Sequence, residues 1–212
     1  MKLELKTLAQ LKKIELLGDK FYIPKIKTPE GSFGPPPLFP KEQEVIKLWR
    51  ISREKGEFLH SLVTTNNCRQ ILELGTSVGY STLFFGDAVK QTKGEVKSIE
   101  VMSEKVGLAR KNLESAGLEK FVKIINANIM DYMHKHNTKI DFLFMDANKS
   151  QYIEYYNSLS KFLTTKALIF ADNILKEKTA PFVDKIRVDL DNGKITEYEI
   201  NYAEDYLIAR YK

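Results

Sequence analysis

The chain has 212 residues, of which 43% are hydrophobic and 29% charged, the balance of an ordinary globular domain. These proportions exclude collagen-like and disordered chains, and the single cysteine, Cys68, excludes an internal disulfide framework. Residues 1–6 lack the apolar core of a signal peptide, and apolar stretches such as residues 167–171 are too short to span a bilayer. We therefore expect a soluble cytoplasmic protein that is not exported and has no membrane partner.

The net charge of +5 is concentrated at the start of the chain. Residues 1–27 contain seven lysines and three acidic residues, a net charge of +4, which leaves +1 for the rest of the chain. Any attraction to nucleic acid or another acidic partner would therefore be a property of this N-terminal arm.

Apolar residues recur at helical spacing near the start of the chain and predict an amphipathic helix over residues 3–17. The series comprises Leu5, Leu8, Leu11 and Ile14. Residues 31–40 are rich in proline and glycine and are expected to form a linker, because proline fixes φ and removes an amide donor. We divide the chain into a basic helix with its linker, residues 1–40, and a larger domain, residues 41–212.

Helical patterns resume at residues 41–50 and 53–66, and Ser52 is the expected N-cap of the second helix. No internal repeat or low-complexity tract is apparent. Four large aromatic side chains are expected in the core: Trp49, Phe58, Phe84 and Phe85.

From Gln70 onward, short apolar strands alternate with helical segments. The expected strands are residues 71–74, 96–100, 121–125, 142–146 and 167–172. This alternation is typical of an α/β protein with a parallel sheet and helices on both faces. Residues 195–200 and 206–211 are separated by only a short polar turn and predict an antiparallel hairpin at one sheet edge.

The first strand leads into a glycine-bearing turn, E-L-G-T-S-V-G-Y-S at residues 73–81. Glycine lets a ligand approach the backbone, and the following helix offers free amides to an anionic group such as a carboxylate. The G-x-x-x-G spacing is not the dinucleotide fingerprint, and no phosphate loop occurs, so a pyrophosphate ligand is disfavoured. Glu100, at the end of the second strand, is placed to accept ribose hydroxyls, although alone it would be interpreted as a solvated acid.

Asp146 and Asp172 each end a buried strand, and Asn173 follows directly. Neighbouring strands lie about 4.8 Å apart, so these oxygens would converge if the two strands are adjacent. Such a cluster favours Mg²⁺, with Ca²⁺ or Mn²⁺ as alternatives, whereas either aspartate alone is nearly as well explained as a helix cap. Lys149 is by default a surface charge, but beside a cation it loses its proton more readily and becomes a candidate general base.

Four motifs are K-G-E-F-L at residues 55–59, L-E-L-G-T-x-x-G-Y-S at 72–81, M-D-A-N-K-x-x-Y at 145–152 and A-D-N-I-L at 171–175. With them, the chain from about Ser52 onward resembles the cation-dependent class I O-methyltransferases that use S-adenosylmethionine, which include catechol and caffeoyl-CoA O-methyltransferases and bacterial relatives. The resemblance implies a Rossmann-like class I methyltransferase fold with a seven-stranded, mostly parallel sheet whose last strand is antiparallel.

The resemblance also implies roles for individual residues. A divalent cation would be bound by Asp146, Asp172 and Asn173, and Lys149 would deprotonate the acceptor hydroxyl. S-adenosylmethionine would be held by Ile51, Glu73, Gly75, Thr76, Tyr80, Ser81, Glu100, Asn128 and Asp146. Within that set, Glu73 lies at the methionine part, Glu100 at the ribose and Asn128 beside the adenine, and Ile51 is in a covering loop.

Three features depart from the family pattern. Asn148 stands where many members have Asp, the triplet at residues 203–205 replaces a common Gly-Asp-Gly, and residues 174–181 lack the usual Trp-x-Gly loop of the acceptor pocket. These departures leave the expected metal ligands intact and leave the acceptor open.

We therefore carry three functions forward. The leading one is methyl transfer to a chelating hydroxyl of a small, catechol-like aromatic acceptor. The second keeps the chemistry but acts on a hydroxylated uridine of tRNA, because the N-terminal arm is rich in lysine. The third is an inert cofactor-binding or regulatory module, against which the complete set of metal and base residues argues. A homodimer is expected, with the apolar face of the N-terminal helix as a candidate interface.

Overall fold

The computed structural model describes residues 3–17, 20–22 and 45–212. Within these ranges, seven strands form one sheet in the order β5-β4-β3-β6-β7-β9-β8. The strands are β3 (Gln70–Leu74), β4 (Glu95–Glu100), β5 (Val122–Asn126), β6 (Ile140–Met145), β7 (Leu163–Asp172), β8 (Ile195–Asn201) and β9 (Tyr206–Tyr211). All are parallel except β9, which is antiparallel to both of its neighbours. The predicted α/β sheet and its C-terminal hairpin at one edge are confirmed.

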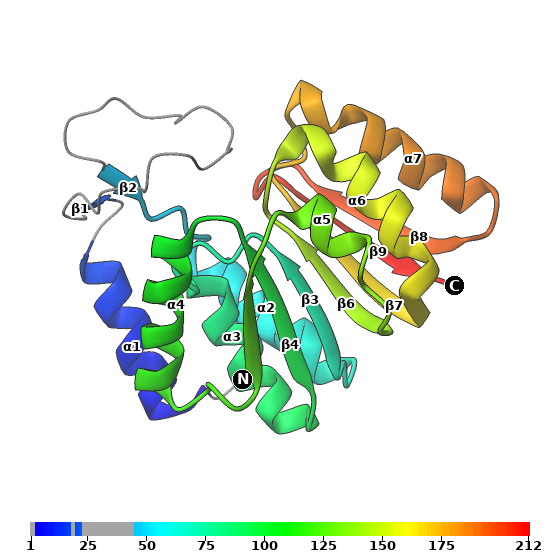
Figure 1. Cartoon of the computed structure of the whole chain (residues 1–212). Coiled ribbons are helices and arrows are strands. Elements are labelled where there is room, and N and C mark those ends of the chain that lie inside the picture. Colours follow the sequence, from blue (N-terminus) through cyan, green and yellow to red (C-terminus); the bar gives the residue numbers. More distant parts are fainter. Residues whose placement is uncertain (1–2, 18–19, 23–44) are drawn as a thin grey trace.

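Helices cover both faces of the sheet (Figure 1). One side carries α1 (Leu5–Leu16), α2 (Arg53–Thr65), α3 (Tyr80–Thr92) and α4 (Ser103–Ala116). The other carries α5 (Ile129–Met133), α6 (Tyr152–Leu159) and α7 (Ala180–Asp191). None of the helices in the described ranges is long and apolar enough to cross a membrane.

Strand β6 shows why the sheet needs both layers. Successive side chains of a strand point to opposite faces, so Phe142 and Phe144 join the core on the α2–α3 side, while Leu143 and Met145 join the core under α6 and α7. The ring of Phe85 on α3 lies 5.7 Å from that of Phe142 and 5.3 Å from that of Phe144. A continuous apolar run is therefore what a central strand with two buried faces requires.

The helix predicted for residues 41–50 is wrong where the structure describes it. Val45–Lys47 form strand β2, which pairs antiparallel with β1 (Lys20–Tyr22). Two of the three β2 residues are β-branched, which favours a strand, and a short apolar run does not distinguish the two structures by its spacing. Residues 31–44, which include the predicted linker, lie outside the described residues.

Two of the four aromatic core predictions are wrong. Phe84 and Phe85 are fully buried as expected, but Trp49 is 64% exposed and Phe58 is 38% exposed. Trp49 lies in a segment without regular structure, and its ring faces the ammonium group of Lys105 at 4.6 Å from the ring centroid. A cation–π contact of this kind accommodates an aromatic ring at the surface.

The N-terminal helix is part of the domain. Leu11 and Ile14 are buried where the helix packs against α3 and α4 of the same chain. Leu5 and Leu16 of the same helix are 84% and 80% exposed. The dimer and the suggested interface on this helix therefore both stay predictions. Three of the lysines of the arm, Lys6, Lys12 and Lys13, face solvent.

A buried polar network fastens α1 to the domain. The Asp87 carboxylate on α3 is 1% exposed and accepts hydrogen bonds from the Thr7 hydroxyl at 3.0 Å and the Glu4 amide at 3.1 Å. The His60 Nε2 atom of α2 lies 3.0 Å from its other oxygen. One carboxylate thus satisfies polar groups from three helices.

We predict that Asp87→Ala lowers the free energy of unfolding by about 3 kcal/mol, because it leaves several buried polar groups without their partner. Urea denaturation measures the loss. The control is Asp184→Ala, which breaks an exposed pair with Arg187 and should change stability by less than about 0.5 kcal/mol. Equal losses in the two variants would show that the network does not hold the helices together.

Candidate active site

The carboxyl ends of β3, β6 and β7 meet at one edge of the sheet. Leu74 pairs with Met145, and Met145 pairs with Ala171, so the three residues that follow in sequence emerge side by side. These residues are Gly75, Asp146 and Asp172. The adjacency on which the metal prediction depended is present, and ligands of such sheets bind at this edge.

The glycine turn between β3 and α3 has the shape of a ligand cradle. Gly75 has a φ of +100°, and a Cβ atom there would lie only 2.2 Å from the carbonyl oxygen of Asp146. Gly79, at φ +83°, is the N-cap of helix α3. The Ser77 hydroxyl is buried without a hydrogen-bond partner in the described part of the chain, which suits a site that gains a polar ligand.

Glu73 lies beneath this turn and is fully buried. Its carboxylate accepts hydrogen bonds of 2.5–2.6 Å from the hydroxyls of Ser81, Thr82 and Ser98. Burial raises the pKa of Glu73 to about 7, even though these hydroxyls favour the charged form. The group is therefore poised to change its charge near neutral pH.

Other expected cofactor residues are engaged within the protein. Glu100 is 8% exposed and accepts the amides of Ser77 at 2.8 Å and Met102 at 3.0 Å, which leaves lone pairs for ribose hydroxyls. It is therefore not a solvent-exposed acid. The Thr76 hydroxyl lies 2.5 Å from that of Ser98, and exposed Asn128 caps α5.

Tyr80 turns away from the cradle. Its hydroxyl donates a 2.5 Å hydrogen bond to Glu15 on α1, and Glu15 also pairs with Arg53 at 2.8 Å. Burial raises the pKa of Tyr80 above its ordinary value, and Glu15 adds to the effect. The side chain therefore ties α1 to the start of α3, while Ile51 is buried in the adjacent core.

Two of the three expected metal ligands, Asp146 and Asp172, each contact a lysine. Asp146 Oδ1 lies 2.5 Å from Lys149 Nζ, and Asp172 Oδ1 lies 2.6 Å from Lys55 Nζ. No hydrogen bond of the Asn173 side chain to another described residue is seen. Two carboxylates and an amide are the hard oxygen donors that suit Mg²⁺. No group of three or more His, Cys, Asp or Glu side chains that could hold a metal occurs among the described residues.

Tyr152 holds the two acidic strand ends in place. Its buried hydroxyl lies 2.8 Å from the Met145 carbonyl oxygen and 3.0 Å from that of Asp172, and it accepts a 2.9 Å hydrogen bond from Lys149. Burial and the neighbouring carboxylates raise the pKa of Tyr152 well above its ordinary value. The group therefore stays a neutral hydroxyl that bridges β6 and β7.

The turn between β8 and β9 supports the second acidic strand end. The Asp205 carbonyl oxygen accepts the Asn173 amide and its Oδ1 accepts the Leu175 amide, both at 2.7 Å. From the sequence, the β8–β9 turn was identified only as a departure from the family pattern. No role in the site was predicted for Lys55 or Tyr152. Their positions inside two of the family-like motifs, residues 55–59 and 145–152, could have indicated that Lys55 and Tyr152 belong to the site.

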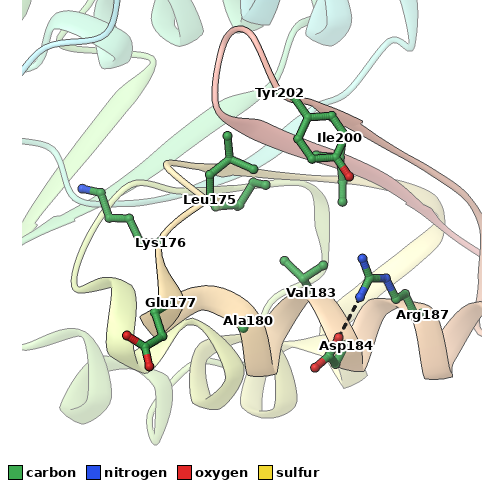
Figure 2. A pocket seen from close by; sticks show the side chains of 10 residues that line it. Leu175, Lys176, Glu177, Ala180, Val183, Asp184, Arg187, Ile200 and Tyr202 are labelled. Carbon is green, nitrogen blue, oxygen red and sulfur yellow. Dashed lines mark hydrogen bonds and ion pairs between the residues drawn. The ribbon is translucent and has the colours of Figure 1, made fainter.

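A pocket of about 220 Å³ adjoins the loop that follows Asn173 (Figure 2). Its lining combines apolar side chains, with Leu175 and Tyr202 across from Val183, and charged ones, which include the ion pair of Arg187 with Asp184. It occupies the place where the sequence lacks the family's Trp-x-Gly loop.

Comparisons with known proteins agree with this geometry. The fold matches an O-methyltransferase from Bacillus cereus in complex with SAH, with a TM-score of 0.73 and 19% identity over 99% of this chain and 92% of the other. It also matches TomG from Streptomyces achromogenes in complex with SAM, with a TM-score of 0.67 and 22% identity over 78% and 82% of the two chains.

Curated relatives include a catechol O-methyltransferase of Niastella koreensis, 30% identical over 60% of this chain, and caffeoyl-CoA O-methyltransferase 2 of Populus trichocarpa, 28% identical over 65%. The chain spans 59% and 63% of the lengths of these relatives. The family model described as O-methyltransferase matches residues 41–205. The chain therefore belongs to the O-methyltransferase family.

Proposed function

We propose that this protein transfers a methyl group from S-adenosylmethionine to a hydroxyl of a small aromatic acceptor, in the cytoplasm and with a divalent cation bound. The observation that carries the proposal is the meeting of the glycine cradle with Asp146, Asp172 and Asn173 at one sheet edge. The structural neighbours that contain SAM or SAH support the choice of methyl donor.

Each residue has a part in the transfer. Glu73 would face the methionine ammonium and Glu100 the ribose, while the amides that begin α3 would hold the carboxylate. The acceptor hydroxyl would give its proton to Lys149 as the base, and its oxygen would take the methyl group while the sulfur keeps the electrons of the broken bond. A divalent cation held by Asp146, Asp172 and Asn173 would supply Lewis-acid stabilisation and orientation.

The acceptor we favour is catechol-like, with a neighbouring oxygen that helps it chelate. The pocket lined by the loop after Asn173 supports this choice, because its apolar side chains, among them Leu175 and Val183, can contact an apolar part of the acceptor beyond the reacting ring. Exposed Lys6, Lys12 and Lys13 are the feature that favours tRNA instead. The inert module and the expected homodimer have no specific support from a described contact.

A screen of methyl uptake from labelled S-adenosylmethionine tests the proposed function. We expect transfer to catechols in the presence of Mg²⁺ and its loss in EDTA or in the Asp146→Ala variant. Transfer to bulk tRNA that weakens steeply with salt would favour the second acceptor class. Full activity in EDTA would contradict metal dependence, and cofactor binding without transfer to either class would favour the inert module.

We predict that both Lys149→Met and Lys149→Arg lower kcat at least about a hundredfold, because neither side chain can take up the acceptor proton. Steady-state kinetics should show KM for S-adenosylmethionine within about twofold of wild type, since Lys149 does not hold the donor. Retained activity in the arginine variant would show that Lys149 supplies charge rather than basicity.

The raised pKa of Glu73 predicts a pH-dependent affinity for S-adenosylmethionine. The ligand ammonium favours the charged carboxylate, so binding releases a proton and affinity falls about tenfold as pH drops from 8 to 6. Calorimetry of Glu73→Gln should show weaker binding at pH 8 and a flatter pH profile. The amine of S-adenosylmethionine titrates in the experiments with wild type and with Glu73→Gln alike. If affinity depends on pH equally in both proteins, Glu73 is therefore not the source of the pH dependence.

A further inference from the structure

Lys55 is an unusual neighbour for a candidate metal ligand. It lies in the first turn of α2, 117 residues before Asp172 in the chain, and its side chain is only 9% exposed. Its ammonium group donates to Asp172 Oδ1 at 2.6 Å and to the Glu204 carbonyl oxygen at 2.7 Å. The ring of Tyr206 lies 5.8 Å away on another side. The Lys55 ammonium group is therefore held by contacts from the end of β7, from β9 and from the turn between β8 and β9.

The lysines balance the charge of the candidate metal site. Asp146 and Asp172 together carry a formal charge of −2, and Lys149 and Lys55 each contact Oδ1 of one carboxylate. The four side chains therefore sum to zero. An arriving divalent cation meets two carboxylates that already have cationic partners, so part of its attraction to them is cancelled.

The two lysines differ in what they can do. Lys149 follows β6 in the same loop as Asp146 and is the proposed base. Lys55 comes from a different layer and reaches the carboxylate through a side chain with little exposure to solvent. Its contacts with Asp172 and Glu204 suit a charge that stays in place rather than one that moves a proton.

We propose that Lys55 is an internal competitor for the divalent cation at Asp172, so that the ammonium group weakens cation binding. This inference rests on the metal site of the proposed function. The divalent cation can contact Asp172 Oδ1 only when the Lys55 ammonium group moves away from that oxygen. Lys55 thereby keeps the cation exchangeable, and occupancy of the site follows the cation concentration around the protein.

Manganese binding to the full chain tests this role directly. Titrations followed by electron paramagnetic resonance would compare wild type with Lys55→Met and Lys55→Gln, which remove the charge, and Lys55→Arg, which keeps it. We expect both neutral variants to bind Mn²⁺ at least about tenfold more tightly, and Lys55→Arg to stay within about threefold of wild type. The glutamine variant can still donate to the Glu204 carbonyl oxygen, which guards against a loss of folding.

Lys185→Met is the matched control. Lys185 pairs with Asp189 at 2.5 Å on α7, so this change removes a similar lysine–aspartate contact outside the candidate site. Its Mn²⁺ affinity should equal that of wild type. Adding Asp172→Asn to Lys55→Met should abolish the gain, because the released carboxylate would then be absent.

Equal or weaker Mn²⁺ binding by the neutral variants would overturn the proposal, as would an equal gain in Lys55→Arg. If wild type binds Mn²⁺ and uses it for methyl transfer while the neutral variants show no gain, only the role of Lys55 is wrong. If no variant binds Mn²⁺ and transfer is undiminished in EDTA, the metal site of the proposed function is wrong as well.

Discussion

The site depends on the parallel pairing of β6 between β3 and β7. Because these strands run in the same direction and in matched register, their last residues reach the same edge of the sheet. The ligand cradle and both acidic strand ends are consequences of that register. A shift of one residue would turn Asp146 to the opposite face and would also bury the wrong side of β6. Packing of two hydrophobic layers thus enforces the position of the polar groups.

Sequence predicted the parts of the molecule whose pattern is local. The seven strands, the Ser52 cap and the convergence of Asp146 with Asp172 follow from apolar runs and from the chemistry of strand ends. The prediction of a helix at residues 41–50 is wrong, because a short apolar run fits a helix or a strand equally well and Val45–Lys47 form a strand. The predicted burial of Trp49 is wrong because, in a segment without regular structure, the direction of a side chain depends on the elements on which the segment packs. The approach of Lys55 to Asp172 joins residues from different layers, which no local pattern records.

The basic N-terminal helix has two unlike faces. Leu11 and Ile14 on one face are buried against the domain, and its Glu15 carboxylate accepts a hydrogen bond from Tyr80 at the start of α3. Its lysines point outward. The helix is thus a structural support of the candidate site and also carries three exposed lysines, Lys6, Lys12 and Lys13. Substitutions of these exposed lysines can therefore change the surface charge of the helix without disturbing the contact of Glu15 with Tyr80.

The close approach of Gly75 to Asp146 has a thermodynamic consequence. The backbone of the cradle touches the backbone that carries a candidate metal ligand, with no side chain between them. If the donor binds as proposed and shifts the turn, it would also shift that ligand. The two binding equilibria are then linked, and linkage is reciprocal: whatever factor the cation adds to the affinity for the donor, the donor adds to the affinity for the cation. Under the proposed function, the close approach at Gly75 would thereby couple binding of the donor to binding of the cation.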